Sequence, residues 1–296
     1  MKSPFIQPLS YIRRYSRYSK YFLIFLIGFL IALLQQFNKR DDSEKGFFKD
    51  LAREVQEKRT AFNEDSTIVD ALHLTSRLLG YRTEIFTKHE EGRYQYDGSL
   101  TGDLMSAKGA CGSYADVLAQ LLETIGFKTR IPQMKVGNIY GGHIITEVLS
   151  SKGWVVLDAS NNLYFTTPAG KLASFQEVSS NWAYYRAQTP KDYNQAYSYA
   201  DVRYTNWQKI PVVMPMLKKV LTITLGEKRV STISIRPYFL RQYRIYCILI
   251  ILSIVFLSVL LLRNLLKRSL GRVISITPNR ASTLSLRLEQ NYSAEG

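Results

Sequence analysis

The chain has 296 residues, a formal net charge of +15 and only two cysteines. Residues 1–20 hold five basic and no acidic side chains, and residues 244–296 hold seven basic and two acidic, so most of the excess charge lies near the two ends. Basic residues of this kind flank apolar runs and favour an anionic membrane surface, so we do not interpret the charge as a sign of nucleic-acid binding. A disulfide-stabilised fold is excluded, because Cys247 falls inside an apolar run where Cys111 could not pair with it.

Two apolar segments predict membrane spans, at residues 21–37 and 244–263. The first reaches the lower length limit for crossing a bilayer, and the second contains 18 uncharged residues from Ile245 to Leu262. The alternatives are a buried core helix for either segment and a cleaved signal peptide for the first. No small-residue cleavage site follows the first segment, which favours a retained anchor. Tyrosines near the second segment stand where an interfacial aromatic belt is expected, at Tyr238, Tyr243 and Tyr246.

The two spans give a five-part domain organisation. A basic tail (1–20) precedes the first span, a middle domain (38–243) lies between the spans, and a second basic tail (264–296) follows the second span. We expect a two-pass protein of the cell membrane with both termini in the cytoplasm and the middle domain in the periplasm or outside the cell. Long loops translocate largely regardless of charge, and a basic N-terminus leading into an apolar run is typical of an export signal.

The first half of the middle domain is predicted to be mainly helical. A charged exit loop is expected at Asn38–Ser43, followed by an amphipathic helix over Gly46–Arg59. A second helix is expected from Ser66 to Gly80, with Asp65 or Ser66 as its N-cap. The stretch Tyr94–Lys108 is rich in turn signals and leads to the cysteine.

The pattern from Cys111 onward changes from helix to strands. An amphipathic helix is expected from Cys111 to about Ile125, with Gly126 ending it. Strand-like runs then follow at Lys128–Val136, His143–Leu149 and Trp154–Leu157. A helix followed by antiparallel strands predicts an α+β fold.

The last part of the middle domain is rich in tyrosine. We expect a helix at Ser174–Arg186 and a hairpin at Lys219–Arg236 that turns at Gly226-Glu227. Two interpretations of the tyrosines stay open: packing around a cleft, or a surface that binds a polymer or peptide. The tyrosines concerned are Tyr184, Tyr185, Tyr193, Tyr197, Tyr199 and Tyr204.

The order Cys111, His143, Asp158 predicts nucleophilic chemistry. A cysteine at a helix N-terminus is favoured as thiolate by the unpaired backbone N–H groups and the helix dipole. His143 follows by 32 residues and Asp158 by a further 15, so a helix packed on adjacent antiparallel strands could bring them together. His143 would then act as the base and Asp158 would orient its imidazole. The alternative for Cys111 is a buried packing residue.

Four blocks around these residues resemble a known family. The blocks are Lys108-Gly-Ala-Cys-Gly-Ser-Tyr-Ala115, Leu121–Arg130, Gly142-His143 and Trp154-Val-Val-Leu-Asp158. They resemble the signatures of the transglutaminase-like superfamily over residues 65–165, the expected core of the middle domain. The resemblance implies a papain-like fold, a Cys111-His143-Asp158 triad, and Trp154 packed behind it.

The resemblance does not supply a second oxyanion donor. Eukaryotic transglutaminases use a tryptophan upstream of the cysteine, whereas all three tryptophans here lie downstream. The expected donors are therefore the Cys111 backbone N–H and one of the candidates Tyr94, Gln95 and Tyr96.

The leading functional hypothesis is a membrane-anchored cysteine peptidase or amidase. It would act on a protein or peptide substrate through a Cys111 thioester, without a metal or cofactor, and with hydrolysis favoured over amine crosslinking because nothing specifies an amine site. The alternatives are an inactive transglutaminase-like binding or scaffold module in an envelope assembly and a purely structural two-span anchor. His73 and His89 are interpreted as satisfied or exposed histidines and not as ligands.

Overall fold

The computed structural model describes residues 8–57, 63–85, 99–105 and 109–292. The chain divides into two compact units: residues 1–39 together with 244–296, and residues 40–243. The two long helices α1 (Pro8–Glu57) and α9 (Gln242–Tyr292) each belong partly to both units. We describe the two units in turn.

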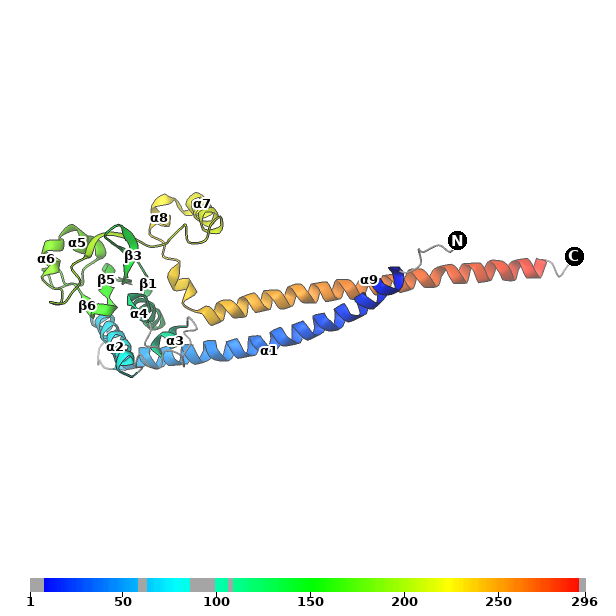
Figure 1. The fold of residues 1–296 in the computed structure, drawn as a ribbon, viewed down its shortest axis with the longest axis horizontal. Helices are drawn as coiled ribbons and strands as arrows, with labels where there is room; N and C mark the ends of the chain where they lie inside the picture. Colours follow the sequence, from blue (N-terminus) through cyan, green and yellow to red (C-terminus); the bar gives the residue numbers. More distant parts are fainter. Residues whose placement is uncertain (1–7, 58–62, 86–98, 106–108, 293–296) are drawn as a thin grey trace. The chain divides into compact units, whose positions relative to one another are not determined.

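The first unit is formed by the two long helices (Figure 1). Each contains a stretch long and apolar enough to cross a membrane, at Ser19–Glu57 and Gln242–Lys267. The helices contact each other through the Phe37 and Tyr246 rings, whose centroids are 5.3 Å apart. The Cys247 thiol donates a hydrogen bond of 3.1 Å to Asn38 Oδ1. Cys247 is therefore engaged within this unit, and Cys111 and Cys247 are both free of disulfides.

The expected exit loop at Asn38–Ser43 is wrong, because α1 continues through it as helix. No proline or glycine interrupts this stretch, and its charged residues form helix-compatible pairs: Lys45 forms ion pairs with Asp41 and Asp42, four and three residues earlier. The amphipathic helix expected from Gly46 is the last part of α1. Its Phe48 and Val55 are buried, whereas the neighbouring Phe47 is exposed.

The next two helices lead to the cysteine. Helix α2 (Glu64–Ile85) begins where Asn63 Oδ1 accepts the Ser66 N–H, so neither Asp65 nor Ser66 is the cap. It also runs past Gly80, where we expected it to stop. Leu79 and Arg82 are both buried, and this packing outweighs the roughly 1 kcal/mol cost of a glycine in a helix. The short helix α3 (Leu100–Leu104), capped by Ser99, lies in the stretch predicted as turns.

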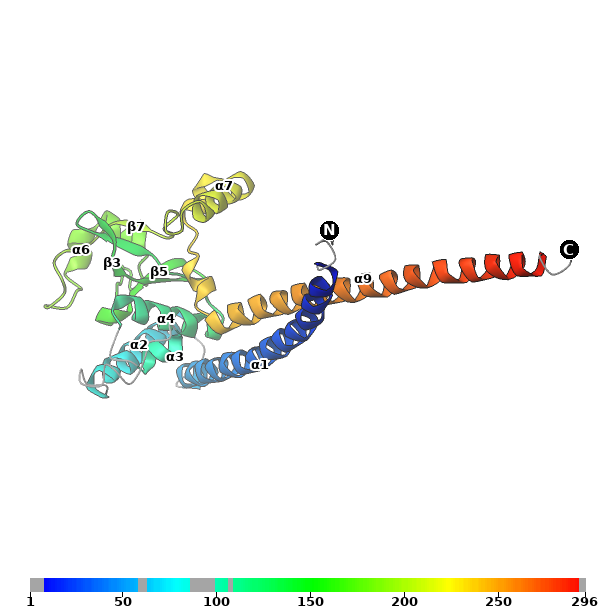
Figure 2. The same ribbon diagram turned by 45° about the vertical axis from the view of Figure 1, so that its right-hand side comes forward.

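Helix α4 (Cys111–Ile125) confirms the predicted nucleophile helix. Its end is set by Gly126, whose φ of 117° gives the left-handed conformation that closes a helix. Its buried side packs in the layer between α2 and the strands (Figure 2). The Thr146 hydroxyl donates a buried hydrogen bond of 3.1 Å to the Ala115 carbonyl, which ties the helix to a strand.

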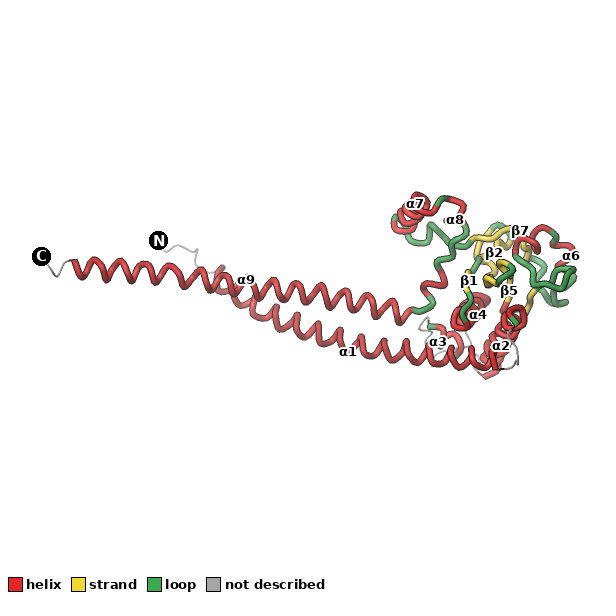
Figure 3. The backbone as a smooth tube through the Cα atoms, turned by 180° about the vertical axis from the view of Figure 1, so that it is seen from behind, coloured by secondary structure: helices red, strands yellow, loops and turns green. Residues whose placement is uncertain are grey.

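The strands form two antiparallel sheets, shown in yellow in Figure 3, which confirms the α+β class. One sheet has the order β1-β4-β5-β6 and the other β3-β2-β7. The strand bounds are β1 (Lys128–Arg130), β2 (Gln133–Val136), β3 (Ile139–Ile144), β4 (Thr146–Ser150), β5 (Gly153–Asp158), β6 (Leu163–Tyr164) and β7 (Tyr197–Arg203).

Two of the predicted strands pass from one sheet to the other. The run Lys128–Val136 is split into β1 and β2 at Ile131-Pro132, because proline cannot donate to a ladder. Opposite this break, Ile145 separates β3 from β4, and its N–H donates to the Pro132 carbonyl. The chain thus changes sheet beside His143, and this position decides where the histidine points.

The second half of this unit departs from prediction at two places. The helix expected at Ser174–Arg186 is two short helices, α5 (Phe175–Ser180) and α6 (Trp182–Arg186), with a capping box at Ser174. The expected hairpin at Lys219–Arg236 is wrong. The chain there forms α7 (Val213–Leu225), α8 (Glu227–Ser231) and the 3₁₀ turn η3 (Arg236–Phe239). Its apolar residues follow the helical period from Val213 onward, and Gly226, with φ of 83°, separates α7 from α8.

Two hydrophobic clusters hold the folded unit together. The first is mainly aliphatic and joins α1, α2 and α4 to β4 and β5, with fully buried Leu72, Leu118 and Leu121. The second is rich in aromatic rings and lies between β5, α5, α6 and β7, with Phe165 and Tyr199 at its centre. Three of the tyrosines that we singled out, Tyr185, Tyr193 and Tyr199, are buried there, which supports packing over a binding surface for these three.

Candidate active site

Cys111 is the first residue of α4 and is partly exposed. The N-cap residue is Ala110, which has no side-chain oxygen to satisfy the first N–H groups of the helix. The Ser113 N–H donates to the Ala110 carbonyl. The N–H groups of Cys111 and Gly112 and the helix dipole are left to stabilise negative charge at the sulfur or on a bound carbonyl oxygen. The backbone N–H of Ile144 also acts to lower the pKa of the Cys111 thiol.

A buried polar cluster holds the chain just before the cysteine. The Arg82 guanidinium donates to the Asp103 carbonyl at 2.6 Å and to the Gly109 carbonyl at 2.9 Å. The Ser113 hydroxyl donates to the Asp103 carboxylate at 2.5 Å. Arg82, Asp103 and Ser113 are all buried. Since buried charges are costly unless paired, this cluster fixes α2, α3 and the start of α4 in one arrangement.

His143 and Asp158 form a hydrogen-bonded pair, with 2.7 Å between His143 Nε2 and Asp158 Oδ2. Strand register explains why they meet. Thr146 lies opposite Leu157 in the pairing of β4 with β5. The next residue of β5, Asp158, therefore lies beside Ile145, where the chain passes from β3 to β4. Both side chains are almost fully buried.

Asp158 accepts hydrogen bonds from several further donors. The Ser160 hydroxyl is 2.9 Å from Oδ1, and the Asn161 side-chain amide is 2.9 Å from Oδ2. The Asn161 backbone N–H and the Tyr193 hydroxyl also donate to the carboxylate. A buried carboxylate with this many donors is held in one orientation, which is what a residue that orients a histidine requires.

The His143 ring is positioned from a second direction by Tyr197. The two rings are stacked, with centroids 4.1 Å apart and planes tilted by 11°. An aromatic face beside an imidazole favours its charged form and restricts its rotation. Tyr193, Tyr197 and Asn161 were not predicted as parts of the site, although the tyrosine-rich zone was singled out. Their sequence separation from His143 gave no signal of these contacts.

The pKa values of Cys111 and His143 shift in opposite directions. Burial acts to raise the pKa of the Cys111 thiol, but the hydrogen bond and charge of His143 outweigh it, and the pKa is lowered. Burial acts to lower the pKa of His143, but Asp158 and Cys111 outweigh it and raise the pKa to about 9. Each group thus stabilises the charged form of the other, as in a thiolate and imidazolium pair.

The use of the two ring nitrogens fits this pairing. Nε2 is taken by Asp158, so Nδ1 is the nitrogen left for the thiol. Nδ1 is buried and has no hydrogen-bond partner in the described part of the chain. It is thus the ring nitrogen that would exchange a proton with the sulfur, while Asp158 holds the far side of the ring.

The remaining site candidates fall elsewhere. Trp154 stands at the opposite end of β5 from Asp158, where the Arg130 guanidinium lies 4.1 Å from its ring centroid. Arg130 pairs with the buried Glu147 and also lies over Tyr204. The structure thus places Trp154 in a separate cation–π cluster. Tyr94, Gln95 and Tyr96, and also His89, lie outside the described residues.

A pocket of about 530 Å³ borders the N-terminal end of α4, the end that carries Cys111. Its polar wall includes Asp116 and Arg236, whose guanidinium donates two hydrogen bonds of 2.7 Å to the carboxylate. This guanidinium lies so close to Gly112 that a Cβ there would come within 2.9 Å of it. Apolar side chains complete the lining, among them Leu100, Ile210, Met214, Ile235 and Phe239. The pocket is thus a neighbour of the residue that follows Cys111.

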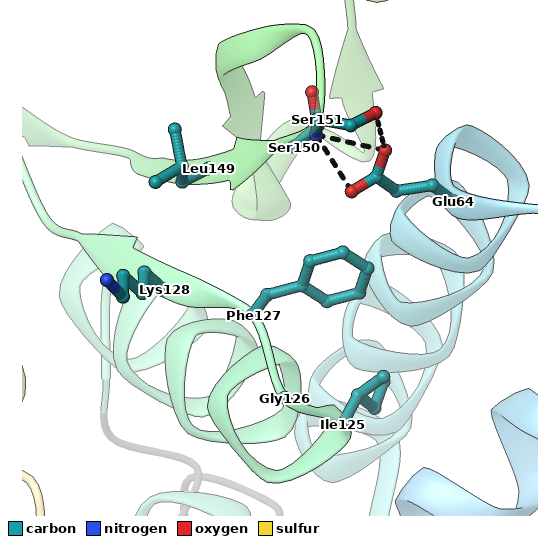
Figure 4. Close-up of a pocket in the computed structure, with 8 residues that line it drawn as sticks. All are labelled: Glu64, Ile125, Gly126, Phe127, Lys128, Leu149, Ser150 and Ser151. Carbon is teal, nitrogen blue, oxygen red and sulfur yellow. Dashed lines mark hydrogen bonds between the residues drawn. The ribbon is translucent and has the colours of Figure 1, made fainter.

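A second pocket lies at the other end of α4 (Figure 4). Phe127 points into it, and the Glu64 carboxylate accepts hydrogen bonds from the Ser151 backbone and hydroxyl. Its lining contains no histidine or cysteine. Since α4 is 15 residues long, this pocket is about 20 Å from Cys111 along the helix and is separate from the candidate site.

Metal binding has no support in the described ranges, where no group of three or more histidine, cysteine, aspartate or glutamate residues could hold an ion. His73 Nδ1 is 2.7 Å from Asn162 Oδ1, which agrees with its interpretation as a satisfied histidine. Comparisons of the chain with models of protein families, with curated proteins and with solved structures gave no match. The function has to be inferred from the geometry of Cys111, His143 and Asp158 themselves.

Proposed function

We propose that the chain is a membrane-anchored cysteine enzyme that cleaves an amide bond through a thioester on Cys111. The arrangement that carries this proposal is the buried His143, held by Asp158 at 2.7 Å through Nε2 and with Nδ1 left for a thiol. The lowered pKa of Cys111 and the raised pKa of His143, each caused in part by the other group, support it. A papain-like or transglutaminase-like core would account for this order of residues along the chain. Its substrate would be a protein or peptide.

The reaction would begin with attack of the Cys111 thiolate on the amide carbonyl. The positive end of α4 and its first backbone N–H groups would stabilise the oxyanion, and protonated His143 would give its proton to the leaving amine. Water would then hydrolyse the thioester, with His143 as its base, and regenerate the thiol. Water is the expected acceptor because the acidic side chains that line the neighbouring pocket already have partners: Asp116 pairs with Arg236, and Asp103 accepts from Ser113.

Two helices support a membrane anchor on both sides of the domain, because each contains a window long and apolar enough to cross a membrane: the first window lies within Ser19–Glu57 and the second within Gln242–Lys267. With both termini in the cytoplasm, the domain and Cys111 would lie on the extracytoplasmic side. An oxidising compartment is hazardous for a thiol without a function. A lone partly exposed cysteine between two anchors is therefore consistent with catalytic use.

The test uses the full chain in detergent or lipid with Cys247→Ser, which leaves Cys111 as the only thiol. Iodoacetamide at pH 6.5 should alkylate Cys111 rapidly, and His143→Ala should slow the reaction strongly because the thiolate loses its counter-ion. Incubation with a set of peptide amides, followed by acid quench and intact-mass measurement, should reveal an acyl group on Cys111. Cys111→Ser is the control for both measurements.

Equal alkylation of the parent and the His143→Ala protein would contradict the proposed ion pair. A fast thiol that never carries an acyl group from any peptide amide would contradict the proposed reaction. Labelling of Cys111 in intact cells by a membrane-impermeant reagent would separately test the side of the membrane.

A further inference from the structure

Helix α7 is an amphipathic helix with a broad apolar face that the described residues of its domain leave exposed. No residue of α7 is buried. At about 100° per residue, its apolar side chains occupy an arc of about 200°. Large exposed fractions mark this arc: Met216 63%, Val220 57% and Ile223 77%.

The opposite side of α7 is polar and basic. Lys218, Lys219 and Thr222 lie there, together with Pro215. Thr224 falls within the apolar arc, but its hydroxyl donates to the backbone carbonyls of Val220 and Leu221. Its hydrogen-bonding capacity is thus met inside the helix, so the hydroxyl does not require water.

The helix is joined to its own domain mainly at one end. Met214 and Ile210, at the start of α7, line the pocket that borders Asp116 and Arg236. Beyond them, the element that α7 packs against is the short helix α8. The apolar arc is thus presented outward along most of the helix.

The chain that follows α7 leads directly to an apolar stretch. Two more exposed aromatic side chains, Tyr238 (77%) and Phe239 (57%), stand just before α9 begins at Gln242. Aromatic residues at the start of an apolar helix are typical of the level of lipid headgroups. The chain between Leu225 and Tyr238 is ordered, since it forms α8 and then binds the domain through Ile233 and Ser234. Helix α7 is therefore attached to the domain close along the chain to these aromatic residues.

We propose that α7 lies in the interface of the lipid bilayer, at the surface where α9 enters it. Val220 and its apolar neighbours would be immersed among the acyl chains, and Lys218 and Lys219 would extend to the headgroup phosphates. A bilayer explains both the width of the apolar arc and its basic border, and the chain already carries the candidate spans that would place it there. This proposal concerns lipid contact and does not depend on the chemistry of Cys111.

The experiment places one fluorescent label on each side of α7. The full chain with Cys111→Ser and Cys247→Ser carries either Val220→Cys or the matched control Lys218→Cys, labelled with a nitrobenzoxadiazole dye. Both positions are exposed, so neither substitution disturbs the core. The proteins are reconstituted in vesicles of equimolar phosphatidylcholine and phosphatidylglycerol, at one protein per vesicle on average.

Lipids that carry a doxyl quencher should reduce the fluorescence at position 220 several-fold more than at position 218, and iodide should show the opposite preference. Equal iodide quenching at both positions, with no lipid quenching, would mean that α7 lies in water and would overturn the proposal. Protection from iodide without lipid quenching would mean that a protein covers the face, which would also overturn it. Since Cys111 is absent from both proteins, neither result bears on the proposed catalysis.

Discussion

The two hydrophobic clusters of the middle domain support the candidate site in different ways. The first is aliphatic, lies around α2 and α4, and positions the helix that presents Cys111. The second is aromatic, and its tyrosines also contribute hydroxyl groups and ring faces to His143 and Asp158. The nucleophile helix is thus positioned by aliphatic packing and by the separate Arg82–Asp103–Ser113 cluster, whereas the aromatic cluster that packs around the base also contacts His143 and Asp158 directly. Mutations in the two clusters should therefore separate stability from reactivity.

The largest effect is expected at Asp158. Replacing it by alanine removes the anion that orients and charges His143, and should reduce amide turnover on the order of 10³-fold to 10⁴-fold. Asp158→Asn keeps a hydrogen-bonding side chain, as in Cys-His-Asn enzymes, and should lose less. Turnover by purified variants, with circular dichroism to verify folding, measures both. A folded alanine variant with unchanged turnover would remove Asp158 from the site.

The next largest effect is expected for one truncation in each hydrophobic cluster. Leu72→Ala in the aliphatic cluster and Phe165→Ala in the aromatic cluster should lower the free energy of unfolding by about 2–5 and 3–5 kcal/mol, because both side chains are fully buried. Only Phe165→Ala should also slow the reaction of Cys111, since Phe165 packs edge-on against Tyr199, which contacts Tyr193. Urea unfolding and alkylation rates give the two readouts. Equal slowing by both variants would contradict the division between the clusters.

The pH dependence should separate the thiol from the histidine. The lowered pKa of Cys111 predicts alkylation that rises with pH below the range of an ordinary thiol and then stays constant. Amide turnover should rise over the same range but fall above about pH 9, where His143 loses the proton that the leaving amine needs. Each limb should change by about tenfold per pH unit. A turnover profile that follows alkylation at high pH would show that His143 is not the acid.

The smallest effect is expected for a single hydroxyl. Tyr193→Phe removes a donor to Asp158 and a partner of Tyr199, at a cost of about 0.5–1.5 kcal/mol in stability. The matched control Tyr184→Phe concerns an exposed ring and should change nothing. Thermal unfolding of the two variants in parallel provides the measurement. Indistinguishable midpoints would mean that the Tyr193 hydroxyl does not support the carboxylate.

Sequence patterns predicted the elements whose signals are local. The nucleophile helix from Cys111 to Ile125 and its end at Gly126 follow from an amphipathic period and a glycine that adopts a positive φ. The pattern failed where tertiary packing or charge pairing outweighs a local signal. Gly80 does not end α2, Asn38–Ser43 stays helical within α1, and the stretch expected as a hairpin forms α7 and α8.

The residues of the candidate site also fall into two groups, those predicted from the sequence and those seen only in the tertiary structure. The sequence supplied Cys111, His143 and Asp158 through their order and spacing, but not the residues that hold them. Tyr197 reaches the site because β7 pairs with β2 in the second sheet, a contact between residues 61 to 70 positions apart, and Tyr193 lies just before β7. Arg82 and Asp103 secure the cysteine loop only because α2 and α3 pack against α4.

The sequence by itself thus determined the apolar stretches and the α+β class, because each depends on composition or on short-range periodicity, and it proposed three candidate site residues from their order. Tertiary structure alone decided that His143 meets Asp158, since this requires the chain to change sheets at Ile145 while β4 and β5 keep their register. It also decided that α7 is a helix with an uncovered apolar face. Such contacts depend on which surfaces remain free after the rest of the chain has packed, and no local pattern encodes that.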